Sequence, residues 1–516
     1  MNLLRTLFTV TSFTLLSRIT GLVREILIAS TFGASVYTDA FNVAFRIPNL
    51  LRRLSAEGAF SQAFVPILAE FKSQKGHGAT HALVDATSIV LTWVLVGFSM
   101  LGIVSSGFIV WVVASGLHHN NKIFALAVTM TQIMFPYILL ISLTALATSV
   151  LNTYNNFSLP AFSPVLLNIS FIISTLVIAP RLDTPIYALA FSVLAGGILQ
   201  LLIQLLGLKR VHMIPRIRLN LVIALAHPGI KRVLWKMMPA SFAVSVAQLS
   251  LIVSTNIASH LEAGSVSWLS YADRLMEFPA ALLGGALGTI LLPSLSKAHT
   301  NADASEYSAL LDWGLRLTFL LAAPSAVALF IYAKPLTATL FNYGQFSSHD
   351  VSMVSQALSA YGVGLLGLTL TKILAPGFYA KQDTKTPVKI ALIVMGITQL
   401  CNALLVPHLA HAGLSLSISI GACVNALLLF FGLRRRSIYT PSARWGVFFM
   451  QLIIACITLA IVMHWFAQLF DWVELGRYPG IRIAVLSVTL VILVILYFMM
   501  LSLMGFKYKC LYHRAK

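Results

Sequence analysis

Residues 17–25 read SRITGLVRE and residues 36–57 read VYTDAFNVAFRIPNLLRRLSAE, so charged side chains interrupt two otherwise apolar segments, 3–32 and 36–71. Apart from Arg5 at the start of the first segment, five arginines lie in these segments: Arg18, Arg24, Arg46, Arg52 and Arg53. A lipid-facing arginine at the centre of a membrane helix costs about 2.5 to 3.5 kcal/mol, so five would cost on the order of 12 to 18 kcal/mol. If these segments span a membrane, the arginines are expected to line a wet interior.

The composition indicates that the chain does span a membrane. Of its 516 residues, 58% are hydrophobic and 10% are charged, whereas soluble domains carry about 25% charged residues. Apolar stretches long enough to cross a bilayer recur along the whole chain. They are 3–32, 36–71, 89–113, 123–151, 157–179, 186–208, 233–259, 266–295, 309–332, 353–380, 388–406, 414–433, 447–470 and 481–503. We therefore predict an all-α polytopic membrane protein with about fourteen transmembrane helices, the first of them not a cleavable signal peptide.

The net charge of +19 could indicate a nucleic-acid partner, so its distribution matters. With the N-terminus in the cytoplasm, 22 of the 35 lysines and arginines fall in cytoplasmic loops and ends, five on the opposite side and eight within spans. This asymmetry follows the positive-inside rule and predicts that both termini are cytoplasmic. Topology and anionic lipid head groups account for the charge, so we expect membrane lipids and no nucleic acid as partners.

The second half of the chain repeats the first. After the sixth span comes a basic connection, and the segment AFRIPNLL from Ala44 is then echoed by ADRLMEFP from Ala272. Because six spans return the chain to the same side, the two halves form a parallel repeat, as in alternating-access transporters. The predicted parts are an N-terminal lobe, a cytoplasmic linker, a C-terminal lobe, and two additional helices with a basic tail: 1–208, 209–236, 237–435 and 436–516.

Charged residues recur at the matching place in the second half, where Asp273, Arg274 and Glu277 lie in the eighth span. Positive and negative groups of the first, second and eighth helices are therefore expected to converge on a central cavity between the lobes. Their spacing also suits ion pairs that hold helices together, since Arg274 and Glu277 are i,i+3 and Arg53 and Glu57 are i,i+4. That structural alternative stays open.

A surplus of arginine favours an anionic ligand over a purely structural role. The three helices hold six arginines against five acids, and Arg316 and Lys372 are expected to have no acid nearby. Pro48, Pro66, Pro279 and Pro293 occupy matched places in the two halves, which predicts bending of these helices. No cofactor or metal is expected, because the four cysteines and thirteen histidines lack ligand spacing and no Walker A sequence occurs.

Three stretches closely resemble one known family. They are SRITGLVRE from Ser17, TDAFNVAFRIPNLLRRLSAEGAFSQAFVP from Thr38 and YADRLMEFP from Tyr271, and they are similar to the MurJ (MviN) lipid II flippases of bacteria, within the multidrug/oligosaccharidyl-lipid/polysaccharide exporter superfamily. The resemblance covers the whole chain. It implies two lobes around a V-shaped cavity that carries the lipid-linked peptidoglycan precursor, lipid II, from the inner to the outer leaflet of the cytoplasmic membrane.

The resemblance also implies residue roles. Cavity arginines of the family match Arg18, Arg24, Arg52 and Arg274, which would bind the pyrophosphate of lipid II; supporting or ion-coupling positions match Asp39, Arg53, Glu57, Asp273 and Glu277. The bidentate guanidinium suits phosphate oxygens. A groove involving the last two helices, 447–470 and 481–503, is implied for the polyprenyl tail, and cell-wall synthesis proteins are possible partners. A drug or cation antiporter, another lipid-linked oligosaccharide exporter, a membrane scaffold and a lipid-modifying enzyme are the alternatives, of which the antiporter would call for buried carboxylates.

Overall fold

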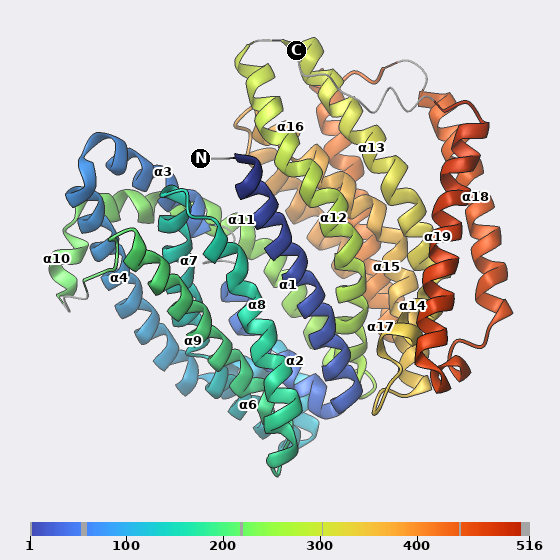
Figure 1. Ribbon diagram of the computed structural model, residues 1–516, viewed down its shortest axis with the longest axis horizontal. Coiled ribbons are helices and arrows are strands. Elements are labelled where there is room, and N and C mark those ends of the chain that lie inside the picture. The colour runs from blue at the N-terminus through green and yellow to red at the C-terminus, as the bar shows by residue number, and fades with distance from the viewer. Residues whose placement is uncertain (1–2, 53–58, 217–219, 302, 443–444, 507–516) are drawn as a thin grey trace. The chain divides into compact units, whose positions relative to one another are not determined.

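The structure is a computed structural model that describes residues 3–52, 59–216, 220–301, 303–442 and 445–506 (Figure 1). For some helical residues it describes the backbone alone: 3–8, 51–52, 59, 62, 238–247, 285–286 and 288–290. Every regular element in these ranges is helical. The chain divides into two compact units, Met1–Val266 and Ser267–Lys516.

The first unit contains a bundle of antiparallel helices with short connections. Within it α1 packs on α8, α8 on α9, α7 on α9, α2 on α6, and α3 on α11. Its elements are α1 (Leu3–Phe32), α2 (Val36–Arg52), α3 (Ala59–Gln74), α4 (Gly76–Val104), α5 (Ser106–Val113), η2 (Ser115–His119), α6 (Asn121–Met134), α7 (Tyr137–Thr153), α8 (Ser158–Ile173), η3 (Ser174–Ile178), η4 (Ala179–Arg181), α9 (Tyr187–Arg210), α10 (Leu221–Leu225) and α11 (Pro228–Ser259).

The second unit is built around α15, which packs on both α13 and α17, while α18 packs on α13 and α19. Its elements are α12 (Ser265–Thr300), α13 (Ala304–Ile331), α14 (Ala333–Phe341), α15 (Ser348–Leu374), α16 (Pro376–Tyr379), α17 (Lys385–Arg435), α18 (Trp445–Leu469), η5 (Glu474–Arg477) and α19 (Pro479–Leu503). The lobe boundaries that we predict at 208 and 237 stay a prediction, although α11 belongs to the first unit here.

The predicted spans coincide with helices. In the described part of the chain, nine helical stretches are long and apolar enough to cross a membrane. They cover ten of the fourteen predicted spans, because one stretch, Lys385–Arg435, contains two of them. The other four predicted spans correspond to α1, α2 with α3, α11 and α12. The all-helical membrane fold is confirmed, and the exact count of fourteen stays a prediction.

Local chemistry sets where the helices begin and bend. The side chain of Ser347 accepts a hydrogen bond from the backbone N–H of Asp350, whose carboxylate accepts one back from Ser347, so α15 begins with a capping box. The long α17 turns at Ala410, whose φ of 48° and ψ of −129° are not helical, as expected between the predicted spans 388–406 and 414–433. By contrast, α12 runs unbroken through Pro279 and Pro293.

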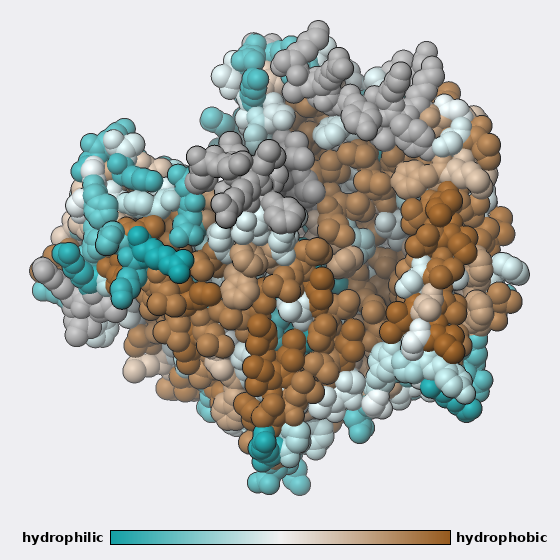
Figure 2. All heavy atoms as spheres, viewed as in Figure 1, coloured by the Kyte–Doolittle hydropathy of each residue, from teal (hydrophilic) through white to brown (hydrophobic). Residues whose placement is uncertain are grey.

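Two apolar cores hold the units together internally. In the first, Phe64 of α3 and Val150 of α7 are fully buried beside Val233 of α11. In the second, α15 and α17 approach each other closely: a Cβ atom on Gly367 would lie 2.6 Å from the backbone nitrogen of Cys423. Small residues at such a contact let membrane helices pack tightly. Figure 2 shows hydrophobic residues covering much of the outer surface drawn, as expected for helices that face lipid.

Candidate functional site

Arg24 is a nearly buried cation in the first unit, and an amide on another helix holds it in place. Its Nη1 donates a hydrogen bond to Oδ1 of Asn168 on α8 at 3.0 Å. Its Nη2 forms an ion pair with the neighbouring Glu25, and the guanidinium carbon lies 5.1 Å from the ring centre of Phe171. The side chain is 13% exposed, and its Nε has no hydrogen-bond partner among the described residues. The site therefore retains one unused donor.

Asn168 is a positioning residue that sequence reasoning missed. It is 6% exposed, and besides accepting from Arg24 it donates from Nδ2 to the backbone oxygen of Ser17 at 3.0 Å and to Oγ1 of Thr20 at 3.1 Å. A buried amide in a membrane helix is costly unless it is hydrogen-bonded, and here the amide ties α8 to α1. The signal in the sequence is an uncharged polar residue, an asparagine, inside the apolar span 157–179.

The other predicted residues of the first unit are placed differently. Arg18 lies on the exposed side of α1. Arg52 is the last residue of α2, and its side chain is not described. Arg53 and Glu57 lie outside the described residues, so their predicted ion pair stays a prediction. The structure thus gives contacts for only one of the three predicted substrate-binding arginines in this unit.

Asp39 has a structural contact at the start of α2. The residue is buried, and its Oδ2 accepts a hydrogen bond from the backbone N–H of Gly264 at 2.7 Å. Gly264 has a φ of 100°, a conformation that favours glycine because it has no Cβ. The carboxylate therefore fixes the turn that follows α11, a role distinct from the ion coupling that the resemblance implies.

The predicted site residues of the second unit lie on α12, and Arg274 and Glu277 are much more exposed than Arg24. Arg274 is 40% exposed, and its Nη1 lies 3.4 Å from Oε2 of Glu277, one turn further along the helix. Asp273 is half-buried on the same helix. Exposed pairs of this kind contribute at most about 1 kcal/mol, so the contact leaves Arg274 able to exchange partners. Convergence of these residues with α1 and α2 stays a prediction.

The expectation that Arg316 has no acid nearby is wrong. Its Nε donates to Oδ2 of Asp312, one turn earlier on α13, at 2.9 Å. The same carboxylate accepts hydrogen bonds from the side chains of Tyr439, Ser442 and Trp445, each at 2.7 Å. This i,i+4 pair was visible in the sequence and was overlooked. Its saturated carboxylate makes it a structural link between α13 and the segment that enters α18.

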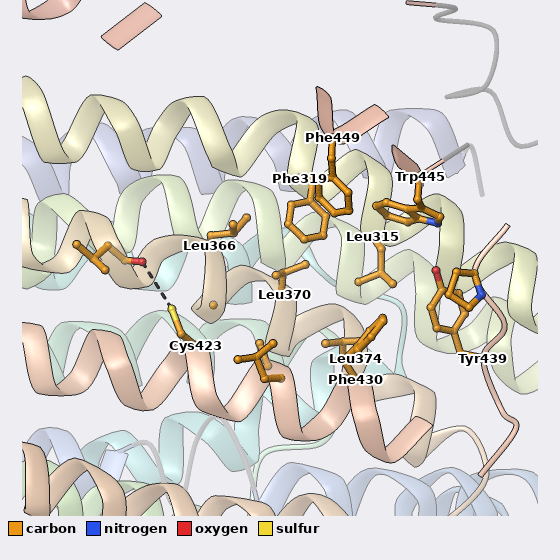
Figure 3. Close-up of a pocket in the computed structure, with 15 residues that line it drawn as sticks. Leu315, Phe319, Leu366, Leu370, Leu374, Cys423, Phe430, Tyr439, Trp445 and Phe449 are labelled. Atoms are coloured by element: carbon orange, nitrogen blue, oxygen red, sulfur yellow. Dashed lines mark hydrogen bonds between the residues drawn. The ribbon is translucent and has the colours of Figure 1, made fainter. Parts of the chain in front are cut away.

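An apolar hollow of about 540 Å³ lies beside this link in the second unit (Figure 3). Side chains of α13, α15, α17 and α18 converge on it, among them Phe319, Leu366, Phe430 and Phe449. A second hollow of about 610 Å³ shares Phe319, Leu366 and Phe449 and continues along α18 toward Ala460. Together they form an apolar groove, which we name the α18 groove. Such a surface suits a hydrocarbon chain.

The fold and these sites define a multi-span helical membrane transporter that combines cationic side chains in its helices with an apolar groove. The family described as lipid II flippase MurJ matches residues 28–481. The chain is 66% identical to lipid II flippase MurJ of Burkholderia cenocepacia over the full length of both proteins. It is 38% identical to the probable lipid II flippase MurJ of Haemophilus influenzae, covering 95% of this chain and 98% of the relative. The chain belongs to the MurJ family of lipid II flippases, which are transporters rather than enzymes.

Solved structures agree on the fold. A lipid II flippase MurJ in an inward closed conformation superposes with a TM-score of 0.79 at 24% identity, covering 97% of this chain and 98% of the other. An inward-facing multidrug resistance transporter of the MATE family and MOP superfamily gives a TM-score of 0.70 at 13% identity, covering 83% and 98%. At these identities the similarity concerns the fold alone.

Proposed function

We propose that this protein moves lipid II from the inner to the outer leaflet of the bacterial cytoplasmic membrane, with both termini in the cytoplasm. The observation that carries the proposal is membership of the MurJ family at 66% identity over the whole chain. The basic character of the predicted cytoplasmic loops supports the orientation. Cell-wall synthesis proteins, which make and use such a precursor, are the partners that this role would require.

The head group would bind through arginine. A pyrophosphate oxygen can replace the Glu25 carboxylate as the acceptor for Arg24, while Asn168 keeps the guanidinium oriented. Charge-assisted hydrogen bonds to phosphate are about twice as strong as neutral ones, and arginine stays charged at any physiological pH. Arg274 has the exposure needed to take part. Arg18 and Arg52 would complete the cationic cavity. Asp39 and Arg53 would support it, and Glu57, Asp273 and Glu277 would support it or couple transport to an ion.

The polyprenyl tail would lie in the α18 groove. The groove is apolar along α13 and α18 and is continuous with the outer, lipid-exposed surface of α18, where Ile453 and Ile457 are exposed. A tail held there stays in a hydrocarbon environment while the head group crosses, so the apolar surface of the tail is not exposed to water. The groove involves α18, the first of the two additional helices, but none of its lining residues belongs to α19.

Alternating access between the two lobes would move the head group, and the membrane potential would give the direction. Moving one elementary charge through 100 mV is worth about 2.3 kcal/mol, so an inside-negative potential favours export of the pyrophosphate. The same potential would draw the empty cationic cavity back toward the inside. Collapse of the potential at a constant pH gradient should therefore slow flipping. Unchanged flipping would leave a substrate or ion gradient as the driver.

The decisive experiment is depletion of the protein in its own bacterium. Lipid II on the outer leaflet is measured by adding an enzyme that cleaves the lipid–sugar pyrophosphate bond only from outside. Depletion should leave lipid II uncleaved in the inner leaflet, and wild-type protein should restore cleavage. Arg24→Ala should fail to restore it at normal membrane abundance, whereas Lys389→Ala, which changes an exposed lysine on α17, should succeed. Normal cleavage after depletion would favour an exporter of another lipid-linked oligosaccharide or of drugs.

A further inference from the structure

The segment 209–236, which joins the two halves of the repeat, has an unusual surface that flipping does not explain. Its sequence, KRVHMIPRIRLNLVIALAHPGIKRVLWK, holds seven basic residues and no acidic one. It also exposes large apolar side chains in its described part: Val222 is 77% exposed, Ile223 70% and Trp235 67%. Large apolar side chains gathered at a surface mark a site of interaction.

The described part of this segment, residues 209–216 and 220–236, is folded onto the first unit. Ala224 of α10 and Ile230 of α11 are buried against Ala86, Ile89 and Val90 of α4. The backbone N–H of Arg216 donates to Oδ1 of Asp85 at 2.8 Å. The guanidinium of Arg232 contacts both carboxylate oxygens of Glu70 on α3, at 2.9 and 2.7 Å. The exposed side chains are therefore presented in a defined direction.

The exposed apolar residues lie on two helices that contact each other, α10 and α11. Val222, Ile223 and Leu225 project from α10, while Leu234 and Trp235 project from the first turns of α11. Exposed basic residues flank them on both sides in the sequence: Lys209, Arg210, Arg216, Lys231 and Lys236. An amphipathic segment with cations beside apolar side chains lies at the boundary between lipid head groups and acyl chains.

The position of α10 selects a membrane over a soluble partner. It packs on α4 at Ala86–Val90, and the next turn of α4 presents Trp93 and Val94, which are 44% and 59% exposed, as expected of side chains that face lipid. Figure 1 shows α10 beside α4 at the outer edge of the first unit. A soluble acidic protein or nucleic acid would bind the cations but would leave the exposed apolar side chains of α10 and α11 in water.

We propose that residues 209–216 and 220–236 form an interfacial anchor that binds anionic phospholipid head groups, with Val222, Ile223 and Trp235 in the acyl boundary. Lys209, Arg210, Arg216, Lys231 and Lys236 supply the charge. Because α11 begins inside this anchor at Pro228, lipid binding holds the first turn of α11 at the membrane surface. The inference depends on the membrane fold and on these contacts, and it is independent of which substrate is flipped.

The test uses full-length protein in nanodiscs, in a background without Cys401, Cys423, Cys456 and Cys510. A polarity-sensitive fluorophore is attached at Val222→Cys or, as the matched control, at Ser73→Cys on the exposed end of α3. In phosphatidylglycerol discs, the label at position 222 should be quenched severalfold less by aqueous iodide than the label at 73, and more by a shallow nitroxide lipid. Equal iodide quenching at the two positions would overturn the anchor.

Charge variants test the lipid class. Each basic residue near an anionic surface contributes about 1 kcal/mol, so Lys231→Gln with Lys236→Gln should lower the ratio of inserted to exposed label about 25-fold. Lys385→Gln with Lys389→Gln, on α17, should leave that ratio unchanged. Equal insertion in phosphatidylcholine discs, with no effect of the first pair, would overturn the anionic preference. If the fluorescence of the label at position 222 changed on addition of soluble polyphosphate in detergent but not in anionic discs, the partner would instead be a soluble acidic molecule.

Discussion

Replacement of Asn168 by leucine should weaken binding of the lipid II head group while the protein stays folded. The substitution keeps the approximate volume and removes the acceptor for Arg24 Nη1 at 3.0 Å. A hydrogen bond to a charged group contributes about 1.5 to 3 kcal/mol. If all of that orienting energy is used when the phosphate binds, affinity should fall about 10- to 150-fold.

The same substitution also removes the two bonds from Asn168 Nδ2 to α1, so stability must be measured separately. Two neutral hydrogen bonds are worth about 1 kcal/mol each, which predicts a lower unfolding temperature without loss of fold. Asn402→Leu is the matched control, because Asn402 is equally buried in the membrane helix α17 and its Nδ2 donates to Gln399 at 3.0 Å. That variant should lose stability but bind lipid II normally.

A double-mutant cycle separates positioning from general loosening. Binding of a lipid II analogue is measured for purified wild type, Arg24→Ala, Asn168→Leu and the double variant in nanodiscs. If Asn168 acts through Arg24, Asn168→Leu should have little further effect on affinity once Arg24 is alanine. The expected coupling energy between the two residues is about 1 kcal/mol or more. Additive losses in affinity would refute the positioning role, even if both single variants bind poorly.

Three further predictions test other parts of the molecule. Arg274→Ala should abolish growth in a depletion strain at normal membrane abundance, while Arg274→Lys should support partial growth because charge is kept; full growth with alanine would remove Arg274 from the anion site. Leu366→Trp should fill the α18 groove and slow transport of lipid II with a long tail, yet spare a short-tailed analogue; equal slowing of both would place the tail elsewhere. In the loop before α17, hydrogen bonds from Thr386 and the guanidinium of Arg436 lower the pKa of Asp383 to about 2. Asp383→Asn should therefore cost about 1 kcal/mol of stability at neutral pH, a difference that disappears as the pH falls from about 4 to about 2; a difference independent of pH would mean that the charge is irrelevant.

The helical architecture could be predicted from sequence because a bilayer leaves the backbone few options. Each backbone N–H and C=O inside hydrocarbon must be paired within its own segment, so an apolar run of spanning length becomes a helix. Even the turn at Ala410 falls between two predicted spans. The matched prolines were less informative, since α12 continues through Pro279 and Pro293. A proline in a membrane helix is tolerated when neighbours satisfy the freed carbonyl, so it marks a possible bend and not a break.

The candidate site could be predicted only in part, because sequence spacing detects partners on one helix and not partners across helices. The contact between Arg24 and Asn168 joins residues 144 positions apart, and no periodicity connects them. The pair of Asp312 and Arg316 follows the i,i+4 rule and could have been found. Because Arg316 is paired with Asp312, the surplus of cations in the spans is smaller than predicted from the sequence, and it gives less support to an anionic ligand.

The two arginines nevertheless differ in their surroundings, and this difference bears on which of them is proposed to bind substrate. Arg316 is paired with the Asp312 carboxylate, which also accepts three side-chain hydrogen bonds, so removal of Arg316 would leave a fixed, largely buried carboxylate without its counter-ion. Arg24 is oriented by the neutral amide of Asn168, which leaves its charge intact, and its counter-ion is the adjacent Glu25. The pair joins adjacent residues of α1, whereas Asp312 and Arg316 have the i,i+4 spacing that places two side chains on one face of a helix. We therefore expect an incoming phosphate to displace Glu25 while the amide keeps Arg24 oriented, and we propose Arg24 rather than Arg316 as the group that binds substrate.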